Sequence, residues 1–546
     1  MNKDAGEIMS KILRGTLLLT GASFLSKFLG MIYVIPFYDL VGETGGTLFS
    51  FAYAPYSIFI SLSTVGIPLA VSKFVSKYNS LGDYESSMRM FKAGSTLMLG
   101  TGFVAFLIMF LSADWIAQFQ IQGEDTDVTA SDVAFVIRMV SIALIVIPSI
   151  SIVRGFFQGH ESMGPTAVSQ IVEQIVRIAF ILVGAFVILH VMGGSVVTAV
   201  GFSTFAAFIG ALASCVVLAI YWKKRKPYLD LQVSRQRYTY NLQMSDLLKE
   251  LFRYAGPFVL VGLAIPLYQF IDQFTFQPAM RASGREDIWV VAYSVINMYG
   301  HKIVIIPMTI ATGLSLAMLP SLTQSFTQKN EQMYTKQINQ SLQIILVLVI
   351  PASLGIAILA DEAYGALFDM DNLSLTGSLL AWYAPIALLF ALFTVTSGIL
   401  QGIDQQNYAV LSLVAGILAK ILLNSQLIQM FGAKGAIFGT ALASGIAVIL
   451  NFWRIKTALA FKFKQTIKRT MLIGIFALIM AIVVWILKAI MGIFLPYGEE
   501  RWAAVLMLVI GAGGGGSVYL LLAYSSTLLE RIFGGRIPLV GRFLGR

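Results

Sequence analysis

The stretch RGFFQGHESMGPTAVSQIVEQIVRI, residues 154–178, decides the fold because it recurs later in the chain. It aligns without gaps with SGILQGIDQQNYAVLSLVAGILAKI, residues 397–421. Identical residues stand at corresponding places, all at one constant offset: Gly155, Gln158, Gly159, Ser169 and Ile178 match Gly398, Gln401, Gly402, Ser412 and Ile421. The alternative is a chance similarity between apolar helices, but the shared QG pair at the same loop position favours an internal duplication.

The composition around this repeat is that of a membrane protein. The 546 residues are 57% hydrophobic and 12% charged, whereas charged residues make up about 25% of a typical soluble domain. Apolar runs long enough to cross a bilayer recur from end to end. The first run is too long, and begins too far inside the chain, for a removable signal peptide. We therefore predict an all-α polytopic membrane protein.

The apolar runs predict about 14 transmembrane helices. They cover 15–37, 47–71, 93–113, 134–156, 166–189, 195–222, 255–277, 290–318, 340–360, 378–400, 407–430, 435–453, 471–494 and 502–524. The repeated segments lie an even number of helices apart, so both copies have the same orientation. This predicts two pseudo-symmetric, parallel six-helix bundles, which is a transporter plan, plus two extra C-terminal helices.

The predicted domain bounds follow from this map. They are 1–222 for the N-terminal bundle (helices 1–6), 223–254 for a basic cytoplasmic linker, 255–460 for the C-terminal bundle (helices 7–12), and 461–546 for helices 13–14 with a basic cytoplasmic tail. None of these segments has room for a soluble catalytic domain.

The 38 Lys and Arg residues are distributed unevenly across this map. Basic runs such as KKRK at 223–226 share one side with both termini, while opposite loops are acidic, as in GEDTDVTASD at 123–132. Because Lys and Arg collect in cytoplasmic loops, we expect both termini in the cytoplasm. The net charge of +10 is then a topology signal, and no nucleic-acid partner is expected.

The sequence lacks the motifs that an enzyme or a metalloprotein would need. Cys215 is the single cysteine, and the 3 histidines show no metal-ligand spacing, so no metal site is expected. The run GAGGGGS at 511–517 lacks the Lys-Ser/Thr ending of a phosphate loop and fits close helix packing instead. We therefore expect a protein that is not an enzyme and has no cofactor.

Charges inside the predicted helices are the candidate functional residues. The cations that lie too deep to reach the membrane surface are Lys27, Arg177, Lys302 and Lys420. Only two acids, Glu173 and Asp272, lie at similar depth. Buried cations in excess of acids are costly unless they line a wet cavity or meet an anionic cargo. Arg138 and Lys488 lie near helix ends, where we expect them to extend to the membrane interface.

Lys27 lies on a polar stripe of the first helix. Thr16, Thr20, Ser23, Lys27 and Gly30 recur at helical spacings of three and four, so they share one face. Such a face contacts protein or water rather than lipid. We assign Thr16 and Gly30 to packing against a neighbouring helix, and Lys27 to a cavity.

Several motifs carry a resemblance to a known family. They are SKFLG (26–30), VSKFVSKYNSLGDYE (71–85), RGFFQGHESMGPTAVSQIVEQIVR (154–177) and LPSLTQSF (319–326). The chain resembles the multidrug/oligosaccharidyl-lipid/polysaccharide (MOP) exporter superfamily, and within it the MurJ-type lipid II flippase branch with its YtgP and SpoVB relatives. This resemblance implies a bacterial cell-membrane protein that translocates an undecaprenyl-pyrophosphate-linked saccharide, with lipid II the leading cargo, by alternating access through a cationic central cavity.

The resemblance also suggests substrate-binding residues. Lys302 in HKIVIIP, 301–307, falls on an essential cation of the family's eighth helix, and Lys27 falls on an arginine of its first helix. The family has further cations near positions that are Tyr33 and Ile60 here. Lys also lacks the two-pronged grip of Arg on phosphate. These departures leave a positive cavity in place but change the side chains that would bind the phosphate groups.

Arg177 has two interpretations. Glu173 precedes it by one helical turn, in the order that favours an ion pair. The pair can therefore be purely structural, or Arg177 can be a third substrate-binding cation of the cavity. The sequence does not choose between them.

Asp272 is the acid without a local partner. Na⁺-coupled relatives use an acid in the seventh helix with polar groups on helices 11 and 12, which implies Asn424 and Thr440 as its counterparts here. Lys420 falls where such a relative has a neutral ligand. Our hypothesis is that the Lys420 ammonium replaces Na⁺ and pairs with Asp272; the rival hypothesis keeps Asp272 as a Na⁺ or H⁺ coupling site. Coupling to the membrane potential is compatible with both.

Other functions stay open at this point. The chain can instead move another wall or capsule polysaccharide lipid, including one made in sporulation. A MATE-like drug/cation antiporter would want acids in the N-terminal bundle, where the first helix offers Lys27. A scaffold for envelope synthesis would not need charges at mid-membrane. The expected partners are an anionic lipid-linked saccharide, membrane lipids and the cell-wall synthesis machinery.

Overall fold

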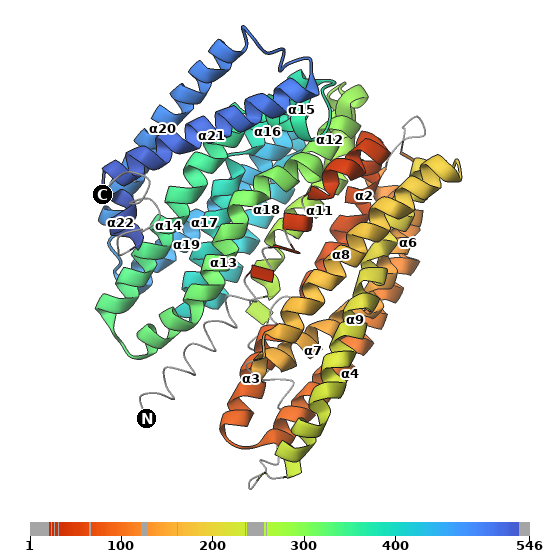
Figure 1. The fold of residues 1–546 in the computed structure, drawn as a ribbon, viewed down its shortest axis with the longest axis vertical. Helices are drawn as coiled ribbons and strands as arrows, with labels where there is room; N and C mark the ends of the chain where they lie inside the picture. The colour runs from red at the N-terminus through yellow and green to blue at the C-terminus, as the bar shows by residue number, and fades with distance from the viewer. Residues whose placement is uncertain are drawn as a thin grey trace. The chain divides into compact units, whose positions relative to one another are not determined.

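The structure is a computed structural model that describes residues 21–22, 25–26, 28–30, 32–64, 67–121, 128–160, 162–234, 236, 256–257 and 259–533. These residues form helices and connecting turns, with no strand among them, as the sequence predicts (Figure 1). The chain divides into two compact units, Met1–Gln277 and Pro278–Arg546, which are described separately below. In the described residues, 11 helices are long and apolar enough to cross a membrane. The chain is therefore a multi-pass membrane protein. The other spans that the sequence predicts do not meet this combined requirement of length and apolar composition within the described residues.

The helices of the first unit follow the chain from α2 to α11. They are α2 (Val34–Thr64), α3 (Ile67–Ser80), α4 (Tyr84–Leu111), α5 (Ala113–Gln120), α6 (Ala130–Ser141), the short η1 (Ile142–Ile145), α7 (Ile147–Gly159), α8 (Gly164–Phe186), η2 (Val187–Val191), α9 (Val196–Ser234) and α11 (Ala264–Ala282), which crosses into the second unit. The core between α3, α4 and α7 includes Val71, Phe74, Met90, Ile152 and Phe156.

The helical path of α2 is broken by a kink at Gly42. Gly42 has φ 63° and ψ −164°, a conformation that suits glycine because it has no Cβ. The residues before the break belong to the first predicted helix and those after it to the second. The structure thus has two helical segments here, as the sequence predicts, but they meet at Gly42 rather than being separated by the whole gap at 38–46.

Two further boundaries differ from the sequence prediction. The predicted helix at 134–156 consists of α6, η1 and α7, with Pro148 in the first turn of α7. Proline has no N–H to continue a helical ladder, which explains the interruption. In addition, α9 continues through Pro227 to Ser234, so the predicted linker at 223–254 begins as helix rather than as loop.

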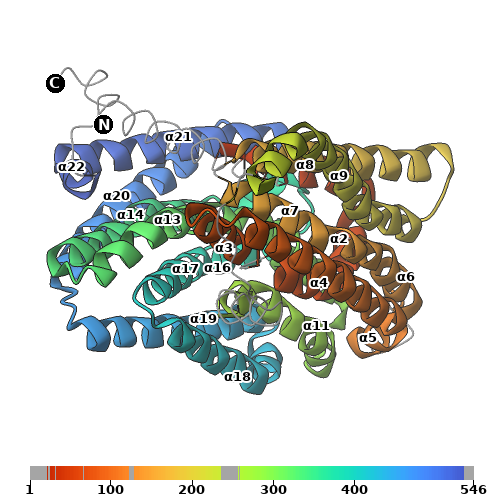
Figure 2. The same ribbon diagram turned by 90° about the horizontal axis from the view of Figure 1, so that it is seen from below.

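The described residues of the second unit, up to Phe533, contain twelve helical segments besides the end of α11. They are η3 (Glu286–Ile288), α12 (Trp289–Asn297), α13 (Tyr299–Thr327), α14 (Glu331–Ile358), α15 (Ala360–Leu367), α16 (Leu373–Tyr383), α17 (Ile386–Gly402), α18 (Gln406–Phe431), α19 (Ala433–Leu459), α20 (Lys464–Met491), α21 (Arg501–Ser525) and α22 (Leu528–Phe533). Figure 2 shows α18 beside α19 within this unit. The predicted helices at 407–430 and 502–524 correspond closely to α18 and α21.

The two extra C-terminal helices pack on α14. Tyr519 Oη donates to the Val347 carbonyl at 2.7 Å, and a shared core includes Leu346, Ile473 and Met480. A Cβ added to Gly515 would lie 2.5 Å from Val484 Cγ2. The glycine run of α21 therefore serves close helix packing, as its sequence predicts.

The QG pair of the repeat has a packing role in each unit. A Cβ on Gly159 would lie 2.6 Å from Val75 Cβ and 2.8 Å from the Ser72 carbonyl oxygen, so α7 approaches α3 closely. A Cβ on Gly402 would lie 2.8 Å from Leu322 Cδ2, so α17 approaches α13 in the same way. Both glycines mark points where two helices touch, which explains why each repeat contains one at this place.

Candidate functional site

A cluster of two arginines and one glutamate lies between α7 and α8. Arg177 Nη2 lies 2.5 Å from Glu173 Oε1, which is the helical pair that the sequence predicts. Arg154 Nη2, from the last turns of α7, lies 2.8 Å from Glu173 Oε2. The side chains of Arg154, Glu173 and Arg177 are 15%, 14% and 20% exposed. One carboxylate therefore serves two guanidinium groups, and the cluster has a net charge of +1.

Arg154, on α7, is held by side chains of two other helices. Its Nε donates to Ser169 Oγ on α8 at 2.9 Å, and its Nη2 donates to Ser214 Oγ on α9 at 2.9 Å. Together with the bond to Glu173, these contacts fix the guanidinium in one orientation. The sequence does not single out Arg154, because the residue lies at the end of a predicted span. Its alignment with Ser397 in the other repeat was the available signal.

Gly210 allows α9 to approach the charged turn of α8. A Cβ at this position would lie 2.8 Å from the Glu173 carbonyl oxygen and 3.0 Å from Arg177 Cβ. Real side chains do not tolerate such contacts without a shift of backbone. The absence of a side chain at Gly210 therefore lets α9 pack directly against the α8 backbone at Glu173.

Three tyrosines lie near Arg177. Tyr33, Tyr53 and Tyr56 all lie within electrostatic range of the Arg177 guanidinium. The rings of Tyr53 and Tyr56 are 5.3 Å apart between centroids. Arg177 Nε is buried and has no hydrogen-bond partner among the residues that the structure describes. Arg177 therefore has donor capacity that Glu173 does not use.

The second unit has a corresponding group of hydrogen-bonded polar side chains, but this group contains no charged residue. Ser412 Oγ donates to Asn451 Oδ1 at 2.6 Å, and Asn451 Nδ2 donates to Ser397 Oγ at 3.1 Å. Ser397 and Ser412 are the repeat counterparts of Arg154 and Ser169. Asn451 lies as far from the start of α19 as Ser214 lies from the start of α9. Equivalent helices are thus joined at equivalent places, but only the first unit uses arginine.

Lys420, Thr440 and Asn424 lie together between α18 and α19. The fully buried Lys420 donates from Nζ to Thr440 Oγ1 at 2.7 Å. Asn424, one turn along α18, packs its side-chain oxygen against Gly439 of α19, where a Cβ would collide with it. The structure therefore brings three of the predicted coupling or charge-pair residues into one buried group.

Asp272 lies in the other unit. It is 2% exposed, and the next residue fixes α11 to α2, because Gln273 Nε2 donates to the Ser50 and Phe51 carbonyl oxygens at 3.0 and 3.1 Å. Gln120 Nε2 also donates to Gln273 Oε1 at 3.0 Å. Because Asp272 and Lys420 belong to separately described units, their pairing stays a prediction.

The two predicted substrate-binding lysines differ in what the structure shows. Lys27 lies outside the described residues. Lys302 lies in the first turn of α13 and is partly buried. Its neighbour His301 is buried and its Nδ1 lies 2.7 Å from Tyr383 Oη on α16. This contact fixes the rotation of α13 around the Lys302 position.

Lys488 forms an ion pair that the sequence does not predict. Its Nζ lies 2.8 Å from Glu362 Oε1 and donates to the Ile358 carbonyl at 2.9 Å. Its place at the membrane interface stays a prediction. Glu362 is fully buried, and its oxygens accept no hydrogen bond of good geometry from the described residues. The sequence does not single out Glu362 either, because this residue follows the predicted end of its helix. Arg138 forms an ion pair with Asp114, both side chains being partly exposed.

No group of three or more His, Cys, Asp or Glu residues in the described part of the chain is arranged to hold a metal ion. The polar clusters above are instead built from cations, hydroxyls and amides. Such groups bind anions or stabilise helix contacts.

Two family models match the chain. The model described as polysaccharide biosynthesis protein matches residues 12–326, more than half of the sequence. The model described as MatE matches residues 290–425.

Individual relatives extend this similarity to nearly the full length. The lipid II flippase MurJ of Bacillus subtilis (strain 168) is 47% identical over 532 residues, which are 97% of this chain and 98% of that protein. The stage V sporulation protein B of the same organism is 23% identical over 75% of this chain and 76% of its own length. Among solved structures, an inward closed lipid II flippase MurJ matches with a TM-score of 0.66 at 15% identity, covering 94% of this chain and 99% of that one.

Proposed function

Because this chain belongs to the polysaccharide biosynthesis protein family, alongside the lipid II flippase MurJ of Bacillus subtilis, we propose that it moves lipid II from the inner to the outer leaflet of the bacterial cell membrane. The 47% identity to that flippase over 97% of the chain carries the proposal. The role is transport in peptidoglycan synthesis rather than catalysis.

The charge balance of the described helices supports an anionic cargo. Arg154 and Arg177 share Glu173, which leaves one positive charge that no acid in the cluster neutralises. The pyrophosphate of a lipid-linked saccharide accepts charge-assisted hydrogen bonds of the kind that Arg177 Nε can donate. In this proposal Arg177 joins Lys27 and Lys302 as a substrate-binding residue, and Arg154 positions Glu173.

We propose alternating access as the mechanism. Both termini lie in the cytoplasm, as the distribution of Lys and Arg predicts, and the two bundles expose a cationic cavity to one side and then the other. A cation that crosses part of the membrane field responds to the inside-negative potential, which is worth about 2.3 kcal/mol per charge per 100 mV. This potential can reset the cationic helices after the cargo leaves.

The buried group around Lys420 is proposed to control coupling. A Lys ammonium bonded to Thr440 at 2.7 Å occupies a place where a cation is favoured. This supports the hypothesis that Lys420 replaces a coupling ion and pairs with Asp272. The rival, a Na⁺ or H⁺ site at Asp272, makes transport depend on those ions. The anionic lipid-linked saccharide and membrane lipids are the proposed partners, with the cell-wall synthesis machinery as a further one.

A second candidate cargo is another wall or capsule polysaccharide lipid, including one made in sporulation. The match to stage V sporulation protein B favours it, but at 23% identity over 75% of the chain it is far weaker than the match to the lipid II flippase. A MATE-like antiporter has the least support, because the MatE match is confined to 290–425.

Depletion of the protein in its own cells tests the choice of cargo. We expect lipid II to accumulate on the cytoplasmic face while other undecaprenyl-linked precursors keep their normal distribution. Accumulation of a different precursor, with lipid II unchanged, would replace lipid II by that precursor as the cargo.

A further inference from the structure

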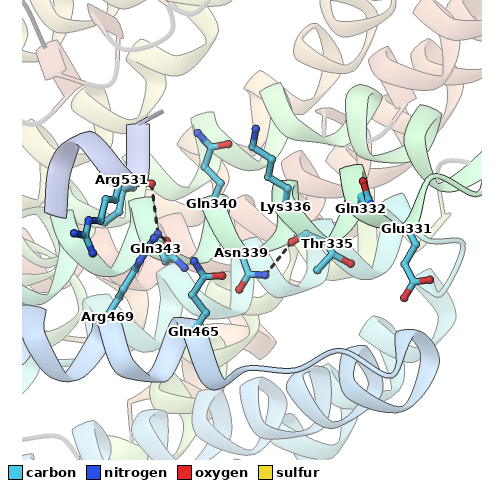
Figure 3. A pocket seen from close by; sticks show the side chains of 11 residues that line it. Glu331, Gln332, Thr335, Lys336, Asn339, Gln340, Gln343, Gln465, Arg469 and Arg531 are labelled. Atoms are coloured by element: carbon cyan, nitrogen blue, oxygen red, sulfur yellow. Dashed lines mark hydrogen bonds between the residues drawn. The ribbon is translucent and has the colours of Figure 1, made fainter. Parts of the chain in front are cut away.

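A polar cavity of about 550 Å³ lies in the second unit between the start of α14, the start of α20 and the short helix α22. Its lining is rich in amides and cations, and Figure 3 shows these side chains along α14 and α20. The lining residues that carry the argument are Glu331, Lys336, Asn339, Gln343, Arg469 and Arg531. None of them belongs to the proposed transport site.

Two arginines meet at one end of this cavity. Arg469 Nη1 donates to Gln343 Oε1, and it lies 3.5 Å from the Arg531 carbonyl oxygen. The guanidinium groups of Arg469 and Arg531 also lie within electrostatic range of each other. Neither forms an ion pair with a carboxylate of the described residues. Two like charges thus lie at the same end of the cavity, and neither has a carboxylate partner among the described residues.

The remaining lining has the same bias. Lys336 adds a third cation. Glu331, the single acid of the lining, begins α14 and lies at the opposite end of the row of labelled side chains from Arg531 in Figure 3. Gln343 is 1% exposed, and its Nε2 has no hydrogen-bond partner among the described residues. Asn339 is oriented by Thr466, whose Oγ1 donates to Asn339 Oδ1 at 2.8 Å. The cavity therefore offers excess positive charge next to fixed amides.

We propose that this cavity binds a phosphate ester whose polar group carries hydroxyls. Arg469 and Arg531 match phosphate oxygens, for which guanidinium donors are well suited, while the amides suit hydroxyls. The volume falls in the range of small-ligand pockets. The proposed topology puts this end of the helices at the cytoplasmic face, where basic pockets between membrane helices bind anionic head groups. The segment that follows α22 carries Arg536, Arg542 and Arg546 but no acid, so it cannot neutralise the pocket.

The ligand has two possible sources, which one binding experiment separates. The full-length protein in a neutral maltoside detergent is titrated with short-chain phosphatidylglycerol, with zwitterionic phosphatidylcholine, and with soluble glycerol 3-phosphate. We expect phosphatidylglycerol to bind and phosphatidylcholine not to compete. Binding of phosphatidylglycerol alone identifies a lipid head group as the ligand; binding of glycerol 3-phosphate as well identifies a phosphate-ester site open to soluble molecules.

Variants tie the binding to the cavity. Arg469→Gln and Arg531→Gln should each weaken phosphatidylglycerol binding at least about tenfold, as expected for loss of a charge-assisted hydrogen bond. Arg469→Lys should be intermediate. Lys468→Gln is the matched control, because Lys468 is the exposed neighbour of Arg469 and does not line the cavity.

Equal affinity of the wild type and the Arg469→Gln/Arg531→Gln double variant would overturn the proposal. So would an equal loss on Lys468→Gln, because the attraction would then be a general effect of surface charge. Thermal unfolding of each variant without ligand shows whether it is folded, and Arg531→Gln keeps its carbonyl contact with Arg469. The assay measures binding, so its outcome is independent of lipid II transport.

Discussion

Arg154 Nη2 lies 2.8 Å from Glu173 Oε2, so a residue on α7 shares the carboxylate that helical spacing assigns to Arg177. This relationship answers part of the question that the sequence leaves open about Arg177. A glutamate with two arginines cannot neutralise both. The cluster therefore connects α7, α8 and α9. It also carries a net positive charge.

Removal of the shared carboxylate should be strongly destabilising. Glu173→Gln leaves two guanidinium groups together without an anion, and breaking a buried pair costs about 3–5 kcal/mol. Thermal unfolding in detergent measures the effect. Glu85→Gln is the control, because Glu85 and Arg89 form a pair of the same spacing that is 36% and 41% exposed, for which about 0–1 kcal/mol is expected. Equal losses would show that the Glu173 cluster is energetically an ordinary surface pair.

Gly210→Ala should loosen the contact between α8 and α9. The new Cβ would meet the Glu173 carbonyl oxygen at 2.8 Å, and such overpacking costs about 1–3 kcal/mol. Gly184→Ala in α8 is the control, since nothing lies within 4 Å of its added Cβ, and alanine is favoured there by about 0.5–1 kcal/mol. Unfolding temperatures should therefore move in opposite directions. A stabilised Gly210→Ala variant would contradict the close packing.

The pair between Lys488 and Glu362 should behave as a buried ion pair. Lys488→Met strands the fully buried Glu362, so the loss in unfolding free energy should be about 3 kcal/mol or more. The double variant Lys488→Met/Glu362→Leu removes both charges and should lose less than the single variant. If the double variant is less stable than Lys488→Met, the attraction between the two charges exceeds the cost of removing them from water.

These contacts separate what the sequence can predict from what it cannot. Periodicity and composition predict the helices, and a spacing of one helical turn predicts the ion pair between Glu173 and Arg177. Arg154 could not be found in this way, since its partners Ser169 and Ser214 come from other helices and meet it only after packing. Glu362 was missed for a related reason: α15 begins just beyond the predicted end of a span, and only tertiary structure shows that Glu362 is buried beside Lys488.

The proposed pairing of Lys420 and Asp272 predicts matched losses of transport. Lys420→Ala and Asp272→Asn should each reduce lipid II flipping at least about tenfold, because each strands a buried charge. The double variant should be little worse than either single one. Loss of transport in Lys420→Ala with normal transport in Asp272→Asn would disprove the pairing. Na⁺- or H⁺-dependent transport lost only in Asp272→Asn would favour the rival coupling site.

The substrate-binding cations predict a charge requirement. Lys27→Ala and Lys302→Ala should abolish flipping while the protein is still made and inserted, whereas Lys302→Arg should retain it because the charge is kept. Lys456→Ala, at an exposed position near the end of α19, is the control and should transport normally. Normal flipping in both Lys27→Ala and Lys302→Ala would end the cationic-grip hypothesis.

The most direct test of the central claim is lipid II flipping by the purified protein in vesicles. The protein is reconstituted with labelled lipid II, and a reagent that cannot cross the membrane then reports which label is reachable from outside. The account predicts that the protected, inner-leaflet fraction falls in protein-containing vesicles and stays protected with the Lys302→Ala variant. A protected fraction equal to that of protein-free vesicles, with the wild-type protein folded and inserted, would contradict it.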